Sequence, residues 1–263
     1  MRLIALFSDV HANLDALKAV LDDIDAAGVS ERYCLGDLVG YGPDPNEVVD
    51  LIRSSGIPTI RGNYDEGIGG RLGACGCYYG TQQARDDGAA SYEFTVAAVD
   101  DERAGWLAGL PDSVRLEEGG ARVLLTHGSP RKINEYLLPD RTEEQLARLA
   151  ERAGADVVCV GHVHIPYHRS FATERGVVHY VSSGSVGKPG DGDPWAAWVG
   201  LVLGSEEDVR AAAPEDAAAA RVGDTATWAG AVVHRVGYDV EAVAGRMRGV
   251  GLPETLAEAL RRA

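Results

Sequence analysis

The sequence predicts an α/β protein in which two packed mixed sheets carry helices on their outer faces. Strand and helix patterns alternate in the first half of the chain, whereas strands follow one another without helices in the second half. The 263 residues suffice for one large domain with a sizeable core. We therefore expect a single domain over 1–263, with a Gly-rich loop or cap at 66–95 and an acidic, Ala-rich insertion at 205–226.

The first half shows the β-α-β-α-β rhythm of a largely parallel sheet. Its clearest helix places Leu17, Leu21 and Ile24 on one face and has Gly28 as its stop. Asn13 is expected to cap this helix rather than to orient a ligand. The predicted strands are 2–8, 32–36 and 58–61, and the predicted helices are 13–27 and 45–54.

The rest of the chain is predicted to hold two further helices, a run of strands and a helical tail. A helix is predicted over 91–109, and another over 142–153 with Thr142 as its cap. The tail, 240–262, is predicted to hold two short amphipathic helices. Two strands are predicted first, at 122–126 and 156–160. Three more follow without helices between them, which suggests a second sheet: 177–182, 195–203 and 229–236.

Charge and hydropathy restrict the partners. The net charge of -15 disfavours contact with long DNA or RNA, although a small anionic substrate remains compatible with a local positive charge. The first apolar stretch is too short for a signal peptide, and no apolar run approaches the roughly 20 residues that a spanning helix needs. We expect a cytoplasmic protein without membrane contact, and the oligomeric state stays open.

The four cysteines do not indicate a disulfide framework. Cys34 and Cys159 lie within apolar runs and are expected to be buried thiols. Cys75 and Cys77 form a C-x-C pair, but the chain has no second pair to complete a zinc site. We interpret them as two unlinked thiols in a loop.

Five polar clusters each follow a predicted strand. Ligand sites of open α/β sheets form at the carboxyl ends of the strands, so we expect the clusters to converge on one edge of one sheet. The clusters are Asp9-x-His11, Gly36-Asp37, Gly62-Asn63, His127-Gly128 and Gly161-His162-x-His164. The adjacent glycines allow a sharp turn or a close approach to an ion.

The residue types in these clusters favour transition metals. Aspartate, asparagine and histidine offer mixed oxygen and nitrogen ligands, which suit Mn²⁺, Fe, Co²⁺, Ni²⁺ or Zn²⁺ better than Ca²⁺ or Mg²⁺. Seven candidate ligands are too many for one tetrahedral ion and the right number for two ions that share a carboxylate. The remaining histidines, His168, His179 and His234, lie in or near strand patterns and are interpreted as ordinary satisfied or surface histidines.

Together the clusters resemble the calcineurin-like metallophosphoesterase family, over residues 3 to about 203. The stretches GDLVGYGPDPNEVV (36–49) and GSVGKPGDGDP (184–194) are similar to small prokaryotic members of the phosphodiesterase type. The resemblance implies a four-layer α/β/β/α sandwich of two mixed sheets flanked by helices. It also implies a first metal on Asp9, His11 and His164, a second on Asn63, His127 and His162, and Asp37 as the bridge.

The resemblance implies a binuclear metal-dependent phosphoesterase, and we expect a phosphodiesterase acting on a small organic phosphate or nucleotide. Two divalent ions, with manganese expected first, would lower the pKa of a bridging water, and the hydroxide would attack phosphorus. The expected catalytic residues are Asp37, Asn63, Tyr64 and His127. The alternatives are a phosphomonoesterase, a dinucleoside polyphosphate hydrolase, or a catalytically weak metal-binding regulatory module.

The sequence departs from the family pattern at Tyr64, where members commonly have a histidine that helps to protonate the leaving group or stabilise the transition state. A tyrosine with its pKa of about 10 is a weaker proton donor. Three roles stay open: slow proton donation, stacking on a base or aryl group, and packing beneath the Gly-rich loop. Arg61 and Arg131 could clamp a phosphate, although a surface role is favoured for each.

Overall fold

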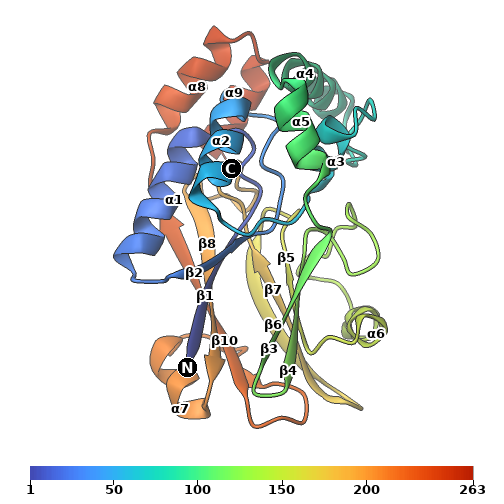
Figure 1. The fold of residues 1–263 in the computed structure, drawn as a ribbon, viewed down its shortest axis with the longest axis vertical. Coiled ribbons are helices and arrows are strands. Elements are labelled where there is room, and N and C mark those ends of the chain that lie inside the picture. The colour runs from blue at the N-terminus through green and yellow to red at the C-terminus, as the bar shows by residue number, and fades with distance from the viewer. Residues whose placement is uncertain (263) are drawn as a thin grey trace.

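The computed structural model describes residues 1–262 and confirms two mixed five-stranded sheets packed face to face (Figure 1). The first sheet has the order β2-β1-β8-β10-β9 and comprises β1 (Arg2–Phe7), β2 (Glu31–Cys34), β8 (Ala196–Gly204), β9 (Ala220–Arg221) and β10 (Trp228–Val236). The second has the order β3-β4-β5-β7-β6 and comprises β3 (Ser113–Glu118), β4 (Ala121–Thr126), β5 (Val157–Val160), β6 (Pro166–Thr173) and β7 (Gly176–Ser183).

Helices cover both outer faces and one end of the sandwich (Figure 1). They are α1 (Leu14–Ala26), α2 (Pro45–Ser55), α3 (Asn63–Gly69), α4 (Gln82–Ala98), α5 (Asp101–Ala108), α6 (Glu143–Ala153), α7 (Glu206–Ala212), α8 (Val240–Gly249) and α9 (Glu254–Arg262). Each sheet mixes parallel and antiparallel pairs: β1 runs parallel to β2 but antiparallel to β8, and β5 runs parallel to β4 and β7.

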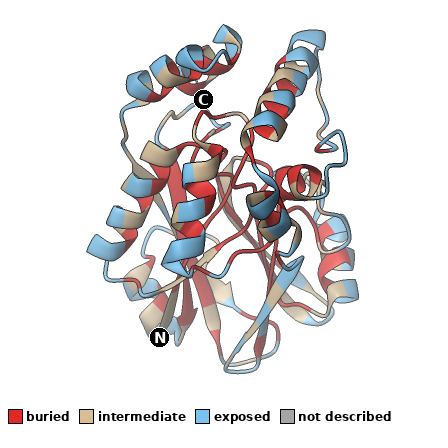
Figure 2. Ribbon diagram, turned by 45° about the horizontal axis from the view of Figure 1, so that its top comes forward, coloured by how far each residue is buried: buried red, intermediate tan, exposed pale blue. Residues whose placement is uncertain are grey.

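The alternation of side chains along β1 shows how the first sheet is sealed on both faces. Ile4 and Leu6 pack between the two sheets, whereas Ala5 and Phe7 pack under α1 and α2. On the far side, Leu146 and Leu149 of α6 cover the outer face of the second sheet. Three apolar layers thus hold the expected α/β/β/α order together, and Figure 2 shows buried residues along the strands and on the inward faces of the helices.

The two edge strands of the second sheet, β3 and β6, were not predicted from the sequence. The side chains of β3 alternate between exposed and half-buried positions, and those of β6 are mostly half-buried, so neither strand has the buried apolar run of a central strand. Conversely, the strand predicted over 58–61 is wrong: only Thr59 pairs there, by a single parallel bridge to Cys34.

The helix predicted over 91–109 is also wrong, because it is two helices. α4 ends at Ala98, and Asp100 begins α5 by accepting a hydrogen bond from the Arg103 backbone N–H at 2.9 Å. α4 starts earlier than expected, where the Thr81 side chain accepts from the Ala84 N–H at 3.1 Å.

Helical turns therefore occupy much of the segment 66–95, whose loop shrinks to 70–81. The insertion 205–226 likewise contains regular structure, because Ser205 and Asp208 form a capping box that starts α7.

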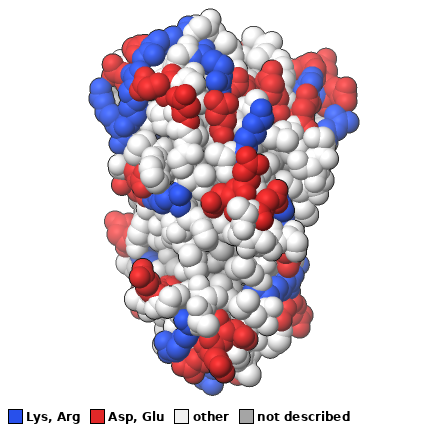
Figure 3. All heavy atoms as spheres, turned by 90° about the vertical axis from the view of Figure 1, so that its left-hand side faces the viewer, with Lys and Arg blue, Asp and Glu red and all other residues white. Residues whose placement is uncertain are grey.

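The predicted tail helices are present as α8 and α9. Arg246 of α8 bonds Asp15 and Asp44 at 3.1 Å each. Figure 3 shows basic and acidic side chains side by side over the upper part of one face of the molecule. Within residues 1–262 no helix is long and apolar enough to cross a membrane.

A buried chain of polar groups, remote from the strand-end clusters, links the second sheet to the segment after α7. The Asp216 carboxylate accepts from His168 Nδ1 at 2.7 Å, and His168 Nε2 lies 3.0 Å from His179 Nδ1. His179 Nε2 donates to the Arg221 carbonyl at 3.2 Å. The interpretation of His168 and His179 as satisfied structural histidines agrees with these contacts.

His179 is expected to make stability depend on pH. Burial, followed by the nearby His168, lowers the pKa of His179 from 6.5 to about 4. The neutral ring is favoured in the fold, so its stabilising contribution is present above pH 6.5 and is lost as the pH falls towards 4. Between pH 7.5 and pH 5 the loss from this residue is about 2 kcal/mol. Urea unfolding of wild type and His179→Gln at both pH values checks this: the variant should lose less stability, and equal losses would contradict the assignment.

Candidate metal centre

The loops at the carboxyl ends of four strands meet at one end of the sandwich and bring the predicted ligands together. Asp9 and His11 follow β1, Asp37 follows β2, His127 follows β4, and His162 and His164 follow β5, while Asn63 begins α3. β1 and β2 belong to the first sheet and β4 and β5 to the second. The expectation that all clusters lie on one edge of one sheet is therefore wrong, and the site lies where the two sheets meet.

Two groups of side chains form within this site. The first comprises Asp9, His11 and His164, and the second comprises Asp37, His127 and His162. Within each group the nearest ligand atoms all lie within 4.8 Å of one another. Each set of one carboxylate and two imidazoles could hold a metal ion.

The backbone turns sharply at five of the seven predicted ligands. These residues adopt positive φ angles between 46° and 66°: Asp9, His11, Asp37, His162 and His164. Such angles cost non-glycine residues of order 1–3 kcal/mol each and tend to cluster at functional sites. Hydrogen bonds between neighbouring loops hold the turns, since the Asp9 N–H donates to Gly36 O at 2.9 Å and the His11 N–H to Asp37 O at 3.0 Å.

Two of the predicted glycines are required by close approach. A Cβ at Gly62 would overlap the Asp37 Oδ1 atom, and a Cβ at Gly161 would lie 2.8 Å from Asp9 Oδ2. These glycines therefore make room for ligand carboxylates, rather than for an ion directly.

The hydrogen bonds of three histidines fix which ring nitrogen faces the centre. Nδ1 lies 3.1 Å from Val39 O in His11, 2.7 Å from Leu35 O in His127 and 2.6 Å from Lys188 O in His164. A carbonyl oxygen only accepts, so each Nδ1 carries a proton. In the neutral ring, Nε2 then presents a lone pair to the centre, as metal-binding histidines do.

As a result, the Nε2 lone pairs of neutral His11 and His127 face other hydrogen-bond acceptors instead of donors. His11 Nε2 lies 3.1 Å from His164 Nε2. His127 Nε2 lies 3.1 Å from the Asn63 Oδ1 atom, whose amide nitrogen is turned away to Cys75 O at 3.0 Å.

Two further polar atoms in the centre, Asp9 Oδ1 and His162 Nε2, are buried without any hydrogen-bond partner. Buried acceptors without donors are costly unless a cation satisfies them. The residues therefore fit metal ions at both groups.

Asp37 lies between the two groups. Its Oδ1 atom accepts from the Tyr64 N–H at 2.8 Å. Its Oδ2 atom lies 3.4 Å from His127 Nε2 and 3.8 Å from His11 Nε2. This position, next to a ring from each group, supports the assignment of Asp37 as the shared carboxylate.

The electrostatics of the site attract positive charge. Burial raises the pKa of Asp9, but His164, His127 and His11 hold it well below its ordinary value. Burial lowers the pKa of His127, yet Asp37 and Asp9 raise it to about 10, so without a metal its Nε2 atom carries a proton that a bound metal ion would replace. Burial, and then the neighbouring His164, lower the pKa of His11 to about 4. The two carboxylates thus stabilise a positive charge beside them, from a proton or from a metal.

Asp65 organises the loops, and the sequence analysis did not assign it this role. Its Oδ2 atom accepts from the Asp37 and Gly62 N–H groups at 2.8 and 2.9 Å, and its Oδ1 atom from the Leu38 N–H at 2.9 Å. Burial, and then the nearby Asp37, raises the pKa of Asp65 to about 7. Its place three residues after Gly62, typical of a capping box, was the available signal.

A hollow of about 310 Å³ opens over the two groups. Its lining includes His11, Asp37, His162 and His164 together with the tyrosines Tyr41, Tyr64, Tyr78, Tyr79 and Tyr136. Tyr64 is fully buried: its ring packs against Gly40 and stands edge-on to His11, with centroids 5.5 Å apart, while its hydroxyl has no hydrogen-bond partner. Tyr136 packs on His162 with centroids 4.1 Å apart.

The C-x-C pair lies closer to the centre than the sequence suggested. Both thiols are free, as expected, but their Sγ atoms lie 3.0 Å apart and Cys77 Sγ lies 3.2 Å from Asn63 Nδ2. The loop 70–81 therefore reaches a predicted ligand.

The two arginines considered as phosphate clamps do not line the hollow. Arg61 bonds Asp112 and Arg131 bonds Glu135, which agrees with the favoured surface roles.

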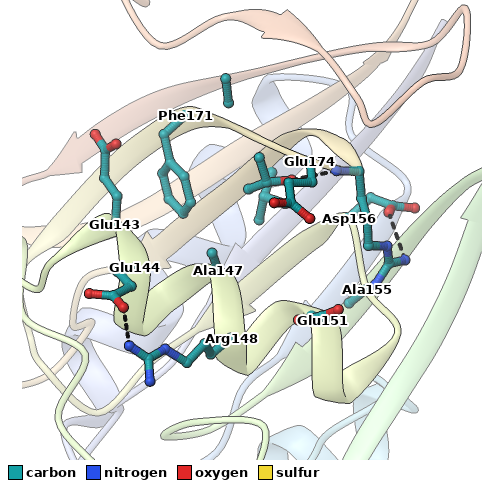
Figure 4. A pocket seen from close by; sticks show the side chains of 13 residues that line it. Glu143, Glu144, Ala147, Arg148, Glu151, Ala155, Asp156, Phe171 and Glu174 are labelled. Atoms are coloured by element: carbon teal, nitrogen blue, oxygen red, sulfur yellow. Dashed lines mark hydrogen bonds and ion pairs between the residues drawn. The ribbon is translucent and has the colours of Figure 1, made fainter.

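A second hollow lies between α6 and the strands β6 and β7 (Figure 4). Both of its arginines pair with acidic side chains of the lining, Arg148 with Glu144 and Arg175 with Asp156, and Figure 4 shows the first of these pairs. None of its side chains has a buried polar atom that lacks a partner. It offers no comparable chemistry, so the metal centre is the candidate functional site.

The two-sheet fold and the paired His/Asp groups agree with the comparison to known proteins. The Calcineurin-like phosphoesterase superfamily domain matches residues 1–202, and the chain belongs to this superfamily of metal-dependent phosphoesterases. The chain is 34% identical over 203 residues to an uncharacterized protein of Methanocaldococcus jannaschii, which covers 72% of this chain and 78% of that protein.

Two solved structures match nearly the whole chain. A metallophosphoesterase from Sphaerobacter thermophilus is 30% identical with a TM-score of 0.67, covering 99% of this chain and 98% of that one. A hypothetical protein from Pyrococcus horikoshii has the same fold at 21% identity, with a TM-score of 0.74 and the same coverage. The similarity to these solved structures thus includes α8 and α9, which lie beyond the family domain.

Proposed function

We propose that this chain is a binuclear metal-dependent phosphodiesterase that hydrolyses a small organic phosphate or nucleotide. The observation that carries the proposal is the meeting of buried acceptors in two adjacent groups, which two cations would satisfy. In this assignment Asp9, His11 and His164 would hold one ion, Asn63, His127 and His162 would hold the other, and Asp37 would be shared between them. We expect manganese, with iron, nickel, cobalt or zinc as alternatives.

When bound, the two ions would supply the charge that activates a water nucleophile and stabilises the transition state. The protein orients the ligands: backbone carbonyls hold three imidazoles in one tautomer, and Asp65 holds the loops of Asp37 and Asn63. The unpartnered Tyr64 hydroxyl is the donor that the chain offers towards a leaving oxygen.

The lining of the hollow favours a diester. Four tyrosines that are not fully buried, Tyr41, Tyr78, Tyr79 and Tyr136, offer surface for organic groups on the phosphate, whereas Lys188 is the one lysine or arginine in the described lining. A monoester carries a second negative charge, and a polyphosphate carries several, which call for more cationic partners. The phosphomonoesterase and dinucleoside polyphosphate hydrolase remain the alternatives that substrate trials separate.

The test is the return of hydrolysis with metal. Protein stripped with a chelator and dialysed should not hydrolyse bis-p-nitrophenyl phosphate, and added Mn²⁺ should restore the reaction. Parallel samples with Ni²⁺, Co²⁺, Zn²⁺, Mg²⁺ and Ca²⁺ rank the metals, and p-nitrophenyl phosphate and a dinucleoside polyphosphate test the alternative substrates.

Elemental analysis of the reloaded protein should give two ions per chain. If the protein binds two ions but hydrolyses none of these esters, it is a regulatory metal-binding module and not an enzyme. Failure to retain any transition metal would reject the centre itself.

A further inference from the structure

Lys188 lies in the loop between β7 and β8 and is joined to the metal centre through its backbone. Its carbonyl accepts from His164 Nδ1 at 2.6 Å, and its N–H donates to Ser185 Oγ at 2.9 Å. Ser185 in turn donates to the Asp9 carbonyl at 2.8 Å. The loop that orients one ligand of the first group therefore also fixes where the Lys188 side chain begins.

The side chain of Lys188 lies between the hollow and the C-terminal helices. It lines the hollow over the metal centre, and it also lines a small apolar cavity together with Val243 and Met247 of α8 and Leu256 of α9. The apolar stem of a lysine packs well against such residues and leaves the charged end at the polar side.

The ammonium of Lys188 has no carboxylate partner in the described part of the chain. It lies 4.8 Å from the centre of the Tyr41 ring, which is a cation–π distance. Tyr41 is itself held edge-on to His11, with centroids 4.9 Å apart. A half-buried cation without an anion is unfavourable, so this geometry is suited to a negatively charged ligand that enters the hollow.

We propose that Lys188 is a substrate-binding residue whose ammonium donates a charge-assisted hydrogen bond to a phosphate oxygen, on the side of the Asp9, His11 and His164 group. The inference rests on the proposed function, because it requires a phosphate ester in the hollow. With tyrosine in place of histidine at residue 64, Lys188 supplies the positive charge that this side of the hollow otherwise takes only from the metals. It fits a phosphate ester with a free anionic oxygen and with organic groups that face the tyrosines.

The variants separate charge from shape. Lys188→Met keeps an unbranched side chain without the charge, and Lys188→Arg keeps the charge. Lys18→Met is the matched control, since Lys18 is exposed on α1, lies outside the hollow and gives the same change of net charge. All variants keep the backbone carbonyl that holds His164, so each should bind two metal ions per chain.

Inorganic phosphate is the probe, and calorimetry on the Mn²⁺-loaded proteins measures its dissociation constant. Loss of a charge-assisted hydrogen bond should weaken binding about 10- to 50-fold in Lys188→Met, with Lys188→Arg within a few-fold of wild type and Lys18→Met unchanged. Equal affinities in wild type and Lys188→Met would overturn the inference.

Chemical labelling gives a readout that does not depend on turnover. The chain has three lysines, Lys18, Lys132 and Lys188, so acetylation followed by peptide mass spectrometry reports each one separately. Phosphate should slow the acetylation of Lys188 in the Mn²⁺-loaded protein and leave Lys18 and Lys132 unchanged. Labelling of Lys188 at the same rate with and without phosphate would also overturn the inference.

The two proposals can fail separately. Phosphate binding that depends on Lys188, in a protein that hydrolyses no ester, would support the subsite and reject the phosphodiesterase. Hydrolysis of the diester with an unchanged KM in Lys188→Met would support the enzyme and reject the subsite.

Discussion

Replacing Asp37 by asparagine is expected to lower kcat/KM for bis-p-nitrophenyl phosphate by about a thousandfold or more. The carboxylate lies between His11 and His127, and its Oδ2 atom is 3.8 and 3.4 Å from their Nε2 atoms. Asparagine removes the negative charge that two neighbouring cations would share. A loss of several kcal/mol of stabilisation corresponds to about 10³-fold in rate.

The measurement combines kinetics with metal content. Asp22→Asn is the matched control, because Asp22 is exposed on α1 and outside both groups. The control should keep full activity and two ions, whereas Asp37→Asn should retain less than two ions after dialysis. Retention of both ions with wild-type kcat/KM would show that Asp37 does not bridge the metals.

Most of the candidate ligands could be predicted from the sequence because they stand directly after buried strands. Asp9 follows the apolar strand β1, and His162 follows β5, whose four residues are all buried. Buried strands make apolar runs, and their carboxyl ends are where ligands gather, so a polar residue there stands out. The α1 helix was predictable for a similar reason, since the Asn13 side chain accepts from the Ala16 N–H at 3.1 Å.

The missing parts depend on contacts between residues that are distant in the chain. Which strands share a sheet is set by pairing, so the sequence did not show that Asp9 and His162 come from different sheets, although Asp9 Oδ2 accepts from the His162 N–H at 2.9 Å. Cys77 and Lys188 reach the site only through the packing of loop 70–81 and the β7–β8 loop. Edge strands such as β6 pack on one side and so leave only a weak pattern.

Replacing Tyr64 by histidine is expected to raise the rate for diesters with poor leaving groups by about 100-fold, with little change for bis-p-nitrophenyl phosphate. Poor leaving groups need a proton in the transition state, and a well-placed imidazolium donates one more readily than a phenol. Burial raises the pKa of Tyr64 well above its ordinary value, which makes the phenol a still weaker acid. The comparison is kcat across a series of diesters whose leaving groups differ in pKa.

Tyr64→Phe separates proton donation from the two roles of the ring, stacking and packing, because it keeps the ring and removes the hydroxyl. The ring is fully buried against Gly40, so its faces are not open to stack on a substrate, and stacking loses support. If Tyr64 serves only in packing, Tyr64→Phe should match wild type with every ester. If the unpartnered hydroxyl donates to the leaving oxygen, Tyr64→Phe should slow the poor leaving groups most. A Tyr64→His variant that folds, holds two ions and shows the wild-type dependence on leaving group would show that residue 64 does not donate the proton here.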